Sequence, residues 1–279
     1  DRWLKAKVHK FSQSFIEKSI RAGRIKVNNK KTKSSYRLQG QDTISLNLFY
    51  DDSKKDSDKF SYNATLKEFK NIKKKIIFEN HDYMVLNKPS SIAVQSGTKS
   101  PKNIIDILNK FSTQKKYFLV HRIDKETSGI LLFACNRVFA QNLSDQFKNK
   151  TVNKQYLAIL YGSIAHNEGT LEHNLSMKEK GKIKSFKAES DFFVIAKNKD
   201  FSYVQASLIT GRKHQLRQQF LKINHPIVGD EKYFLPSNSA ANHLMLHSYQ
   251  LSFEYQNKIK KYQVDPPLEF KNFLKKINL

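Results

Sequence analysis

The chain has 279 residues, of which 50 are Lys or Arg and 25 are Asp or Glu, giving a formal net charge of +25 at pH 7. This length suits one large domain plus a small one, and an apolar content of 39% can bury a sizeable core, which excludes a largely disordered chain. The charge indicates a polyanionic partner, either nucleic acid or an anionic membrane surface. The single cysteine, Cys135, excludes an internal disulfide and a cysteine-rich zinc site, and no apolar run is long enough to span a membrane. The chain begins at Asp1 rather than at a methionine, and we therefore expect that it is trimmed.

Residues 1–48 are predicted to form a small α/β unit in the order helix, helix, strand, turn, strand. The first helix is indicated by apolar residues spaced as on one helical face: Leu4, Val8 and Phe11. A second helix is expected to begin with a capping box at Ser14 and Glu17 and to end at Gly23. Two short strands with alternating apolar residues follow, and Asn28-Asn29 forms the turn after the first of them.

Basic residues gather on the second helix and the first turn of this unit: Lys18, Arg21, Arg24, Lys26, Lys30 and Lys31. A charge run of this kind is often only a solvated face, and that alternative stays open. The helix-then-strand pattern with a basic face resembles the small RNA-binding fold found in a ribosomal protein and in several RNA-modifying enzymes. The resemblance implies that Lys18, Arg21, Arg24 and Lys26 bind RNA.

Residues 49–75 are predicted to be a flexible polar linker. The stretch 51–59 contains no apolar residue, so it cannot offset the entropy lost when a chain becomes ordered. A mobile tether would let the N-terminal unit search for RNA while it stays attached.

Residues 76–279 are expected to form a second, larger domain made mostly of strands. Strands are predicted at 82–86, 118–120, 130–134, 155–160, 191–196 and 203–209, and helices at 104–111, 139–147 and 270–277. The sequence shows no βαβ alternation and no internal repeat. The fold class is therefore α+β, a mixed and mainly antiparallel sheet with flanking helices, rather than a doubly wound sheet.

Several common chemistries lack their motifs. The chain has neither the glycine-rich loop of NTPases nor the G-x-G-x-x-G of dinucleotide-binding enzymes. His243 and His247 are spaced i, i+4 without a following Glu, which favours a strand or core edge over a zinc site. Cys135 ends an apolar strand, so we expect a buried, unreactive thiol rather than a nucleophile.

One polar loop, residues 121–129, lies between two predicted strands that would hold it rigidly. Asp124 is flanked there by Arg122 and Lys125, and these cations are expected to keep its carboxylate ionised. A carboxylate can attack an electrophilic carbon, as in glycosidases. The alternative is that Asp124 only caps a turn by accepting hydrogen bonds from nearby amides.

A second polar stretch, residues 209–217, follows a predicted strand and leads into a helix. Arg212, His214 and Arg217 would cluster at the start of that helix, where they could hold phosphates or pair with a buried carboxylate. The alternative is a basic helix terminus without a functional role.

Together these stretches resemble the RluA-type pseudouridine synthases. His121-Arg122-Ile123-Asp124-Lys125-Glu126-Thr127-Ser128-Gly129 matches their H-R-[LI]-D-x-x-T-S-G motif, and four further segments agree in order: 85–89, 154–158, 210–217, and the pair 225–230 with 246–247. The likeness spans roughly residues 76–270. Gln218-Gln219 stands near a position where the family commonly has His, and the segment between His225 and His243 lacks several usual glycines.

The resemblance implies a cofactor-free isomerisation of uridine to pseudouridine in RNA, and the N-terminal unit and residues 92–97 suggest the RluC-like branch that acts on 23S rRNA. By the same resemblance, Asp124 is catalytic, Tyr156 stacks on the flipped base, and Arg217 pairs with Asp124 and lowers its pKa. Arg122 would enter the RNA stack, and His121, Arg212 and His214 would contact RNA.

Two other functions stay open: a non-catalytic ribosome-assembly factor on the same fold, and an RNA glycosylase that releases free uracil. We expect no metal, no membrane and no DNA partner, a monomer, and a bacterial cytoplasmic location, with an organelle as the other setting.

Overall fold

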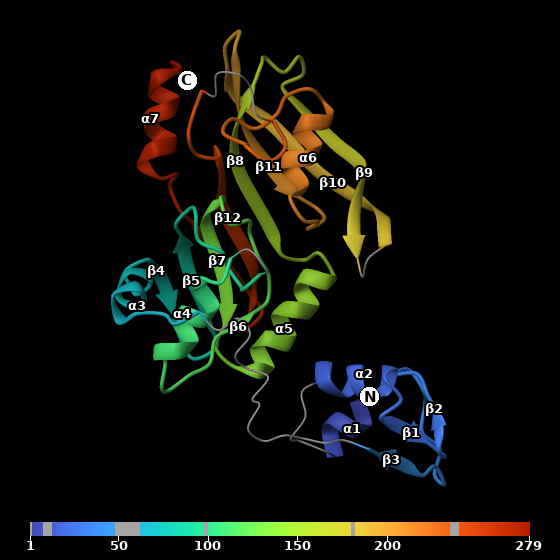
Figure 1. Ribbon diagram of the computed structural model, residues 1–279. Helices are drawn as coiled ribbons and strands as arrows, with labels where there is room; N and C mark the ends of the chain where they lie inside the picture. Colours follow the sequence, from blue (N-terminus) through green and yellow to red (C-terminus); the bar gives the residue numbers. More distant parts are fainter. Residues whose placement is uncertain (1, 8–12, 48–61, 98–99, 180–181, 235–239) are drawn as a thin grey trace. The chain divides into compact units, whose positions relative to one another are not determined.

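The computed structural model describes residues 2–7, 13–47, 62–97, 100–179, 182–234 and 240–279. The chain divides into two compact units, Asp1–Lys59 and Phe60–Leu279, and each is treated by itself (Figure 1). Of the sequence-based expectations, Val8, Phe11 and residues 49–61 of the predicted linker fall outside the described residues.

The N-terminal unit has the predicted order of elements, with one additional short strand. Its elements are α1 (Arg2–Lys7), α2 (Gln13–Arg21), β1 (Ile25–Val27), β2 (Lys30–Lys31) and β3 (Ile44–Leu46). Strand β1 pairs antiparallel with both β2 and β3. Asn28 and Asn29 both have positive φ, 51° and 56°, the backbone that a tight hairpin turn requires. The core is formed by Leu4, Ile16, Ile20 and Ile25.

The second unit is built on a sheet of ten strands with flanking helices, as the α+β prediction requires (Figure 1). The strands run in the order β4-β5-β7-β12-β8-β11-β10-β9, with β6 on β7 and β13 on β12. Its strands are β4 (Ile76–Glu79), β5 (Tyr83–Lys88), β6 (Phe118–Leu119), β7 (Ser128–Ala134), β8 (Asn153–Tyr161), β9 (Glu168–Glu179), β10 (Lys182–Lys197), β11 (Phe201–Leu208), β12 (Leu246–Tyr255) and β13 (Lys258–Gln263). Its helices are α3 (Leu66–Lys73), α4 (Ile104–Phe111), α5 (Arg137–Lys148), α6 (Gln215–Lys222) and α7 (Leu268–Lys276).

Helix α3 lies inside the stretch 49–75 that was expected to be linker, so that expectation is wrong for its second half. A capping box starts the helix, because the Thr65 side chain accepts from the Glu68 amide while Glu68 reaches back to the Thr65 amide. Ile72 is buried and Phe69 packs against the core. The prediction extended the polar character of residues 51–59 into this segment, although the segment contains a capping box and apolar residues at helical spacing.

The central strand β7 is buried on both faces. Ile130 and Leu132 face one hydrophobic cluster with Leu143 of α5, whereas Leu131 and Phe133 face the main cluster, which includes α4. Beside β7 runs β12, its only parallel neighbour among the described strands. Where the two strands pair, Gly129 lies opposite Ser248 and has a φ of 105°. A Cβ at this position would collide with the Ser248 carbonyl oxygen, so only glycine fits.

Candidate active site

A cavity of about 520 Å³ opens in the second unit between the loop 121–127, strand β8 and the start of α6. This volume is in the range of small-molecule sites. All seven functional residues predicted for this unit border it: His121, Arg122, Asp124, Tyr156, Arg212, His214 and Arg217. Within the described part of the chain, no cluster of His, Cys, Asp or Glu side chains could hold a metal ion.

Buried contacts fix the loop that carries Asp124. The Lys88 ammonium is fully buried, and it donates to the carbonyl oxygens of Pro89 (2.8 Å), Ile92 (3.0 Å) and Lys125 (2.9 Å). These acceptors satisfy all three N–H groups of the ammonium and tie the end of β5 to the loop. Burial lowers the pKa of Lys88 to about 7.

The imidazole of His121 anchors the other end of the loop. Its Nε2 accepts a hydrogen bond of 2.8 Å from the Leu132 amide, and its ring stacks on Phe147 at 4.8 Å. Burial lowers the pKa of His121 to about 3, so the ring is neutral at physiological pH. Because Nε2 is the acceptor, the ring hydrogen is on Nδ1.

Arg217 forms a bidentate ion pair with Asp230 rather than with Asp124. Its Nε and Nη2 donate to the two carboxylate oxygens of Asp230 at 2.8 and 2.6 Å. Its remaining Nη1 lies 3.6 Å from both Asp124 Oδ2 and Glu126 Oε2 and has no hydrogen-bond partner. Asp230 therefore holds the guanidinium in place, and the free Nη1 faces the carboxylates of the loop.

The expected lowering of the Asp124 pKa is not observed. Burial is the largest influence and raises this pKa, Glu126 raises it further, and the opposing effects of Arg217 and Arg122 are too small to reverse the shift. The side chain is only 18% exposed, and the hydration that its carboxylate loses outweighs the neighbouring cations from which the lower pKa was expected. A carboxylate with a raised pKa is also a stronger base than a free one.

His214 faces Asp124 from the start of α6, in a left-handed conformation with φ of 53°. Its Nδ1 lies 2.8 Å from the Tyr233 hydroxyl and 3.3 Å from the Lys232 ammonium, which can only donate, so Nδ1 is an acceptor. Burial lowers the pKa of His214 to about 3, and the neutral ring therefore carries its hydrogen on Nε2, 3.7 Å from Asp124 Oδ1.

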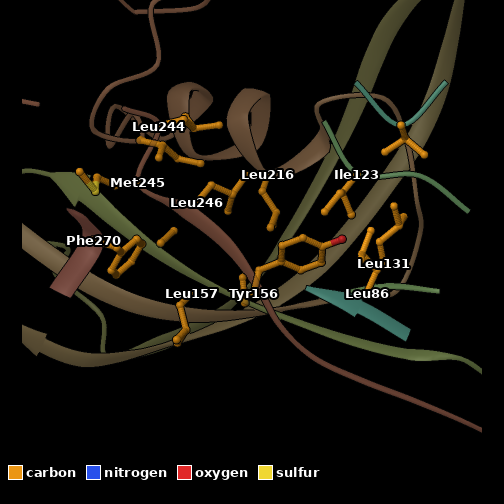
Figure 2. Close-up of a cluster of buried hydrophobic side chains, with 14 of the residues drawn as sticks. Leu86, Ile123, Leu131, Tyr156, Leu157, Leu216, Leu244, Met245, Leu246 and Phe270 are labelled. Atoms are coloured by element: carbon orange, nitrogen blue, oxygen red, sulfur yellow. The ribbon is translucent and has the colours of Figure 1, made fainter. Parts of the chain in front are cut away.

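Tyr156 projects from β8 into the main hydrophobic cluster at the floor of the cavity. Figure 2 shows its ring beside Leu216, with the hydroxyl on the side of Ile123. Burial raises the pKa of Tyr156, and the Ser248 side chain offsets this only in part, so the phenol keeps its proton at neutral pH.

The two arginines at the edge of the cavity are held differently. Arg212 donates from Nε to the Lys187 carbonyl at 3.1 Å, with its guanidinium over the Phe186 ring. Arg122 is exposed, and no ion pair or hydrogen bond holds its side chain in the described structure. It is thus free to move toward a bound strand.

The remaining candidates lie elsewhere or are structural. Lys18, Arg21, Arg24 and Lys26 are exposed on the N-terminal unit. His247 is buried as expected and bonds to Ser128 Oγ and the Val264 carbonyl. Cys135 is buried, as expected, and burial raises the pKa of its thiol to about 12, so the thiol keeps its proton at neutral pH.

Sequence reasoning missed three functional positions: Lys88, Asp230 and Tyr233. Lys88 and Asp230 stand in segments that carry the family resemblance, so a search for buried charge partners could have found them. Tyr233 follows Asp230 by three residues, and only the fold brings it to His214.

Comparison with known proteins agrees with this geometry. A family described as RNA pseudouridylate synthase matches residues 82–222, and the S4 domain matches residues 1–44. The chain belongs to the RNA pseudouridylate synthase family. It is 31% identical to the ribosomal large subunit pseudouridine synthase C of Buchnera aphidicola subsp. Schizaphis graminum over 98% of this chain and 92% of the relative. It is 35% identical to the protein of the same name from Rickettsia felis, over 84% of this chain and 80% of the relative.

A solved structure of this family has the same fold as the second unit. Human RNA pseudouridylate synthase domain containing 4 superposes with a TM-score of 0.66 at 22% identity, covering 76% of this chain and 96% of the human chain. The described helices include none that is both long and apolar enough to cross a membrane.

Proposed function

We propose that this pseudouridine synthase isomerises uridines in RNA of the large ribosomal subunit, 23S rRNA. The observation that carries the proposal is the position of Asp124, which borders a cavity of about 520 Å³ together with Tyr156 and Arg217. The names of the full-length relatives support the choice of RNA. The S4 domain and the charge of +25 support a long polyanionic partner.

In the proposed reaction, the bond between C1′ and N1 breaks, the uracil turns, and a bond between C5 and C1′ forms. Atoms and electrons balance within the nucleotide, so no cofactor is required. Asp124 either attacks C1′ or removes a ribose proton to give a glycal, and its raised pKa suits both roles because each needs a basic carboxylate.

The other cavity residues are assigned supporting roles. Tyr156 stacks on the flipped uracil, and its hydroxyl must first lose its proton before it can accept the proton at C5, because its pKa is raised. Arg217 orients Asp124 through the free Nη1, and Arg122 fills the space that the flipped base leaves. His121, Arg212 and His214 line the path of the strand.

An assay with a 23S rRNA transcript tests the proposal. We expect the wild-type enzyme to form pseudouridine, detected by mass spectrometry of the nuclease digest, and Asp124→Asn to form none. Bound but unmodified rRNA would support the assembly-factor alternative, and free uracil would support the glycosylase alternative.

We also propose that the enzyme is a monomer located where bacterial ribosomes are assembled, in the cytoplasm. Sedimentation of the protein at several concentrations tests the first point, because a dimer would gain mass as the concentration rises.

A further inference from the structure

Lys154 is a nearly buried cation without a counterion. The residue is only 9% exposed, and in the described parts of the chain no carboxylate lies within ion-pair distance and no hydrogen bond reaches its ammonium. Burial lowers the pKa of Lys154, and the positive charge of Lys150 lowers it further. Lys154 Nζ is not among the fully buried atoms that lack a partner, so the ammonium reaches the cavity. A poorly hydrated charge without a counterion is destabilising, and its retention at a cavity indicates a binding role.

Lys154 borders the cavity beside the catalytic groups. Side chains alternate along a strand, so Lys154 and Tyr156 of β8 share one face, and both line the cavity. The Lys154 ammonium also lies 5.9 Å from the centre of the Phe147 ring, the ring on which His121 stacks. The positive charge of Lys154 also lowers the pKa of His121, so the ammonium lies near the imidazole.

His121 adds a neutral donor to this wall of the cavity. Its Nε2 is taken by the Leu132 amide, so its Nδ1–H remains, and no described residue accepts from it. Lys148 and Lys150 border the same cavity from the end of α5 and the turn that follows. This side of the cavity thus gathers one N–H donor and three lysine side chains.

We propose that His121, Lys150 and Lys154 form a phosphate-binding subsite that holds a backbone phosphate next to the flipped uridine. The inference rests on the proposed RNA substrate. A phosphate supplies the negative charge that Lys154 lacks and accepts the Nδ1 hydrogen of His121. The uracil base carries no charge and would leave Lys154 uncompensated, so the base belongs on the side of Tyr156 and the phosphate on this wall.

The substitution Lys154→Met tests the subsite, because it removes the charge and keeps the aliphatic stem. Its matched control is Lys261→Met, an exposed lysine in strand β13. Binding of a short fluorescein-labelled oligouridylate is measured at several KCl concentrations. We expect Lys154→Met to weaken binding roughly tenfold or more and to lower the slope of log Kd against log salt by about 0.7, the share of one neutralised phosphate on a single strand. An unchanged slope would overturn the proposal.

Thermal unfolding of the free enzyme separates this role from a structural one. A lysine kept for binding destabilises the empty protein, so Lys154→Met should raise the unfolding midpoint, whereas a midpoint below that of the control would mark Lys154 as structural and overturn the proposal.

Carbon-13 NMR of the Lys154 side chain identifies the ligand group. Saturating oligouridylate, and inorganic phosphate at higher concentration, should raise the pKa of Lys154, and uridine should not. An equal rise with uridine would contradict a phosphate site. None of these measurements needs turnover, so a wild-type enzyme that binds oligouridylate through Lys154 but forms no pseudouridine would refute the proposed reaction and leave the subsite standing.

Discussion

The two units of this chain hold their charges in opposite ways. In the second unit, the catalytic one, the charged groups nearest the proposed reaction are largely buried and lie against one another, as Arg217 does against Asp230 and Asp124. In the N-terminal unit Lys18, Arg21, Arg24 and Lys26 are exposed to solvent. A buried charge depends on a single partner, whereas exposed charges act together and are screened by salt. Single substitutions should therefore have large effects at the buried pairs of the catalytic unit and small, additive effects in the N-terminal unit.

The largest effect is expected for Asp124→Asn. The amide can neither attack C1′ nor remove a ribose proton, so the single-turnover rate on rRNA should fall on the order of 10³-fold or more, as when other catalytic carboxylates are replaced. The affinity for rRNA should change little, because the substitution removes only one charge among many. A residual rate within tenfold of wild type would refute the catalytic role.

The next largest effect is expected for Asp230→Asn, which leaves the guanidinium of Arg217 buried without its two-bonded partner. Breaking a buried pair on one side lowers the free energy of unfolding by about 3 kcal/mol or more, which chemical denaturation can measure. The matched control is Asp265→Asn, whose partner Lys271 is exposed and whose own side chain is 73% exposed, and it should be close to neutral. Equal effects of the two substitutions would show that burial does not distinguish these ion pairs.

Tyr156→Phe should keep the ring and remove the hydroxyl. Stacking survives, so RNA affinity should stay within a few-fold, whereas turnover should fall roughly 10²-fold if the hydroxyl takes part in proton transfer. The control is Tyr249→Phe, whose hydroxyl accepts a hydrogen bond from Gln263. Unchanged turnover in Tyr156→Phe would remove the hydroxyl from the mechanism.

The contribution of Asp124 to the stability of the fold should depend on pH. The folded-state pKa of Asp124 is raised, so its contribution to stability is fully present below its ordinary pKa and is lost as the pH rises through the folded-state value. An asparagine does not ionise, so Asp124→Asn avoids the loss of stability that ionisation of the buried carboxyl causes. The variant should therefore unfold at a higher temperature than wild type at pH 7, and the difference should shrink toward pH 4. A variant that is less stable at pH 7 would show that Asp124 is held by a net favourable ion pair.

Local patterns predicted what depends on neighbours in the sequence. The helices at 104–111 and 139–147, the strand at 130–134 and the placement of Asp124 in a loop between two strands all agree with the structure. Sequence could not show that Arg217 pairs first with Asp230, because the carboxylates of Asp124 and Asp230 both lie within reach of one guanidinium only after folding. It also could not weigh burial against charge at Asp124, since burial belongs to the tertiary structure.

The smallest effects per residue are expected in the N-terminal unit. Replacing Lys18, Arg21, Arg24 and Lys26 together by Gln should weaken rRNA binding and lower the salt slope of log Kd by up to about 0.7 for each phosphate that is no longer neutralised, while each single replacement changes affinity only slightly. Their exposure predicts no loss of thermal stability, because none of these side chains belongs to the apolar core of the unit. The control is a variant with Lys258, Lys260, Lys261 and Lys275 of the catalytic unit replaced by Gln, which has the same net charge. If both variants lose the same affinity, the N-terminal unit contributes only bulk charge, and its basic face is a solvated surface rather than an RNA-binding one.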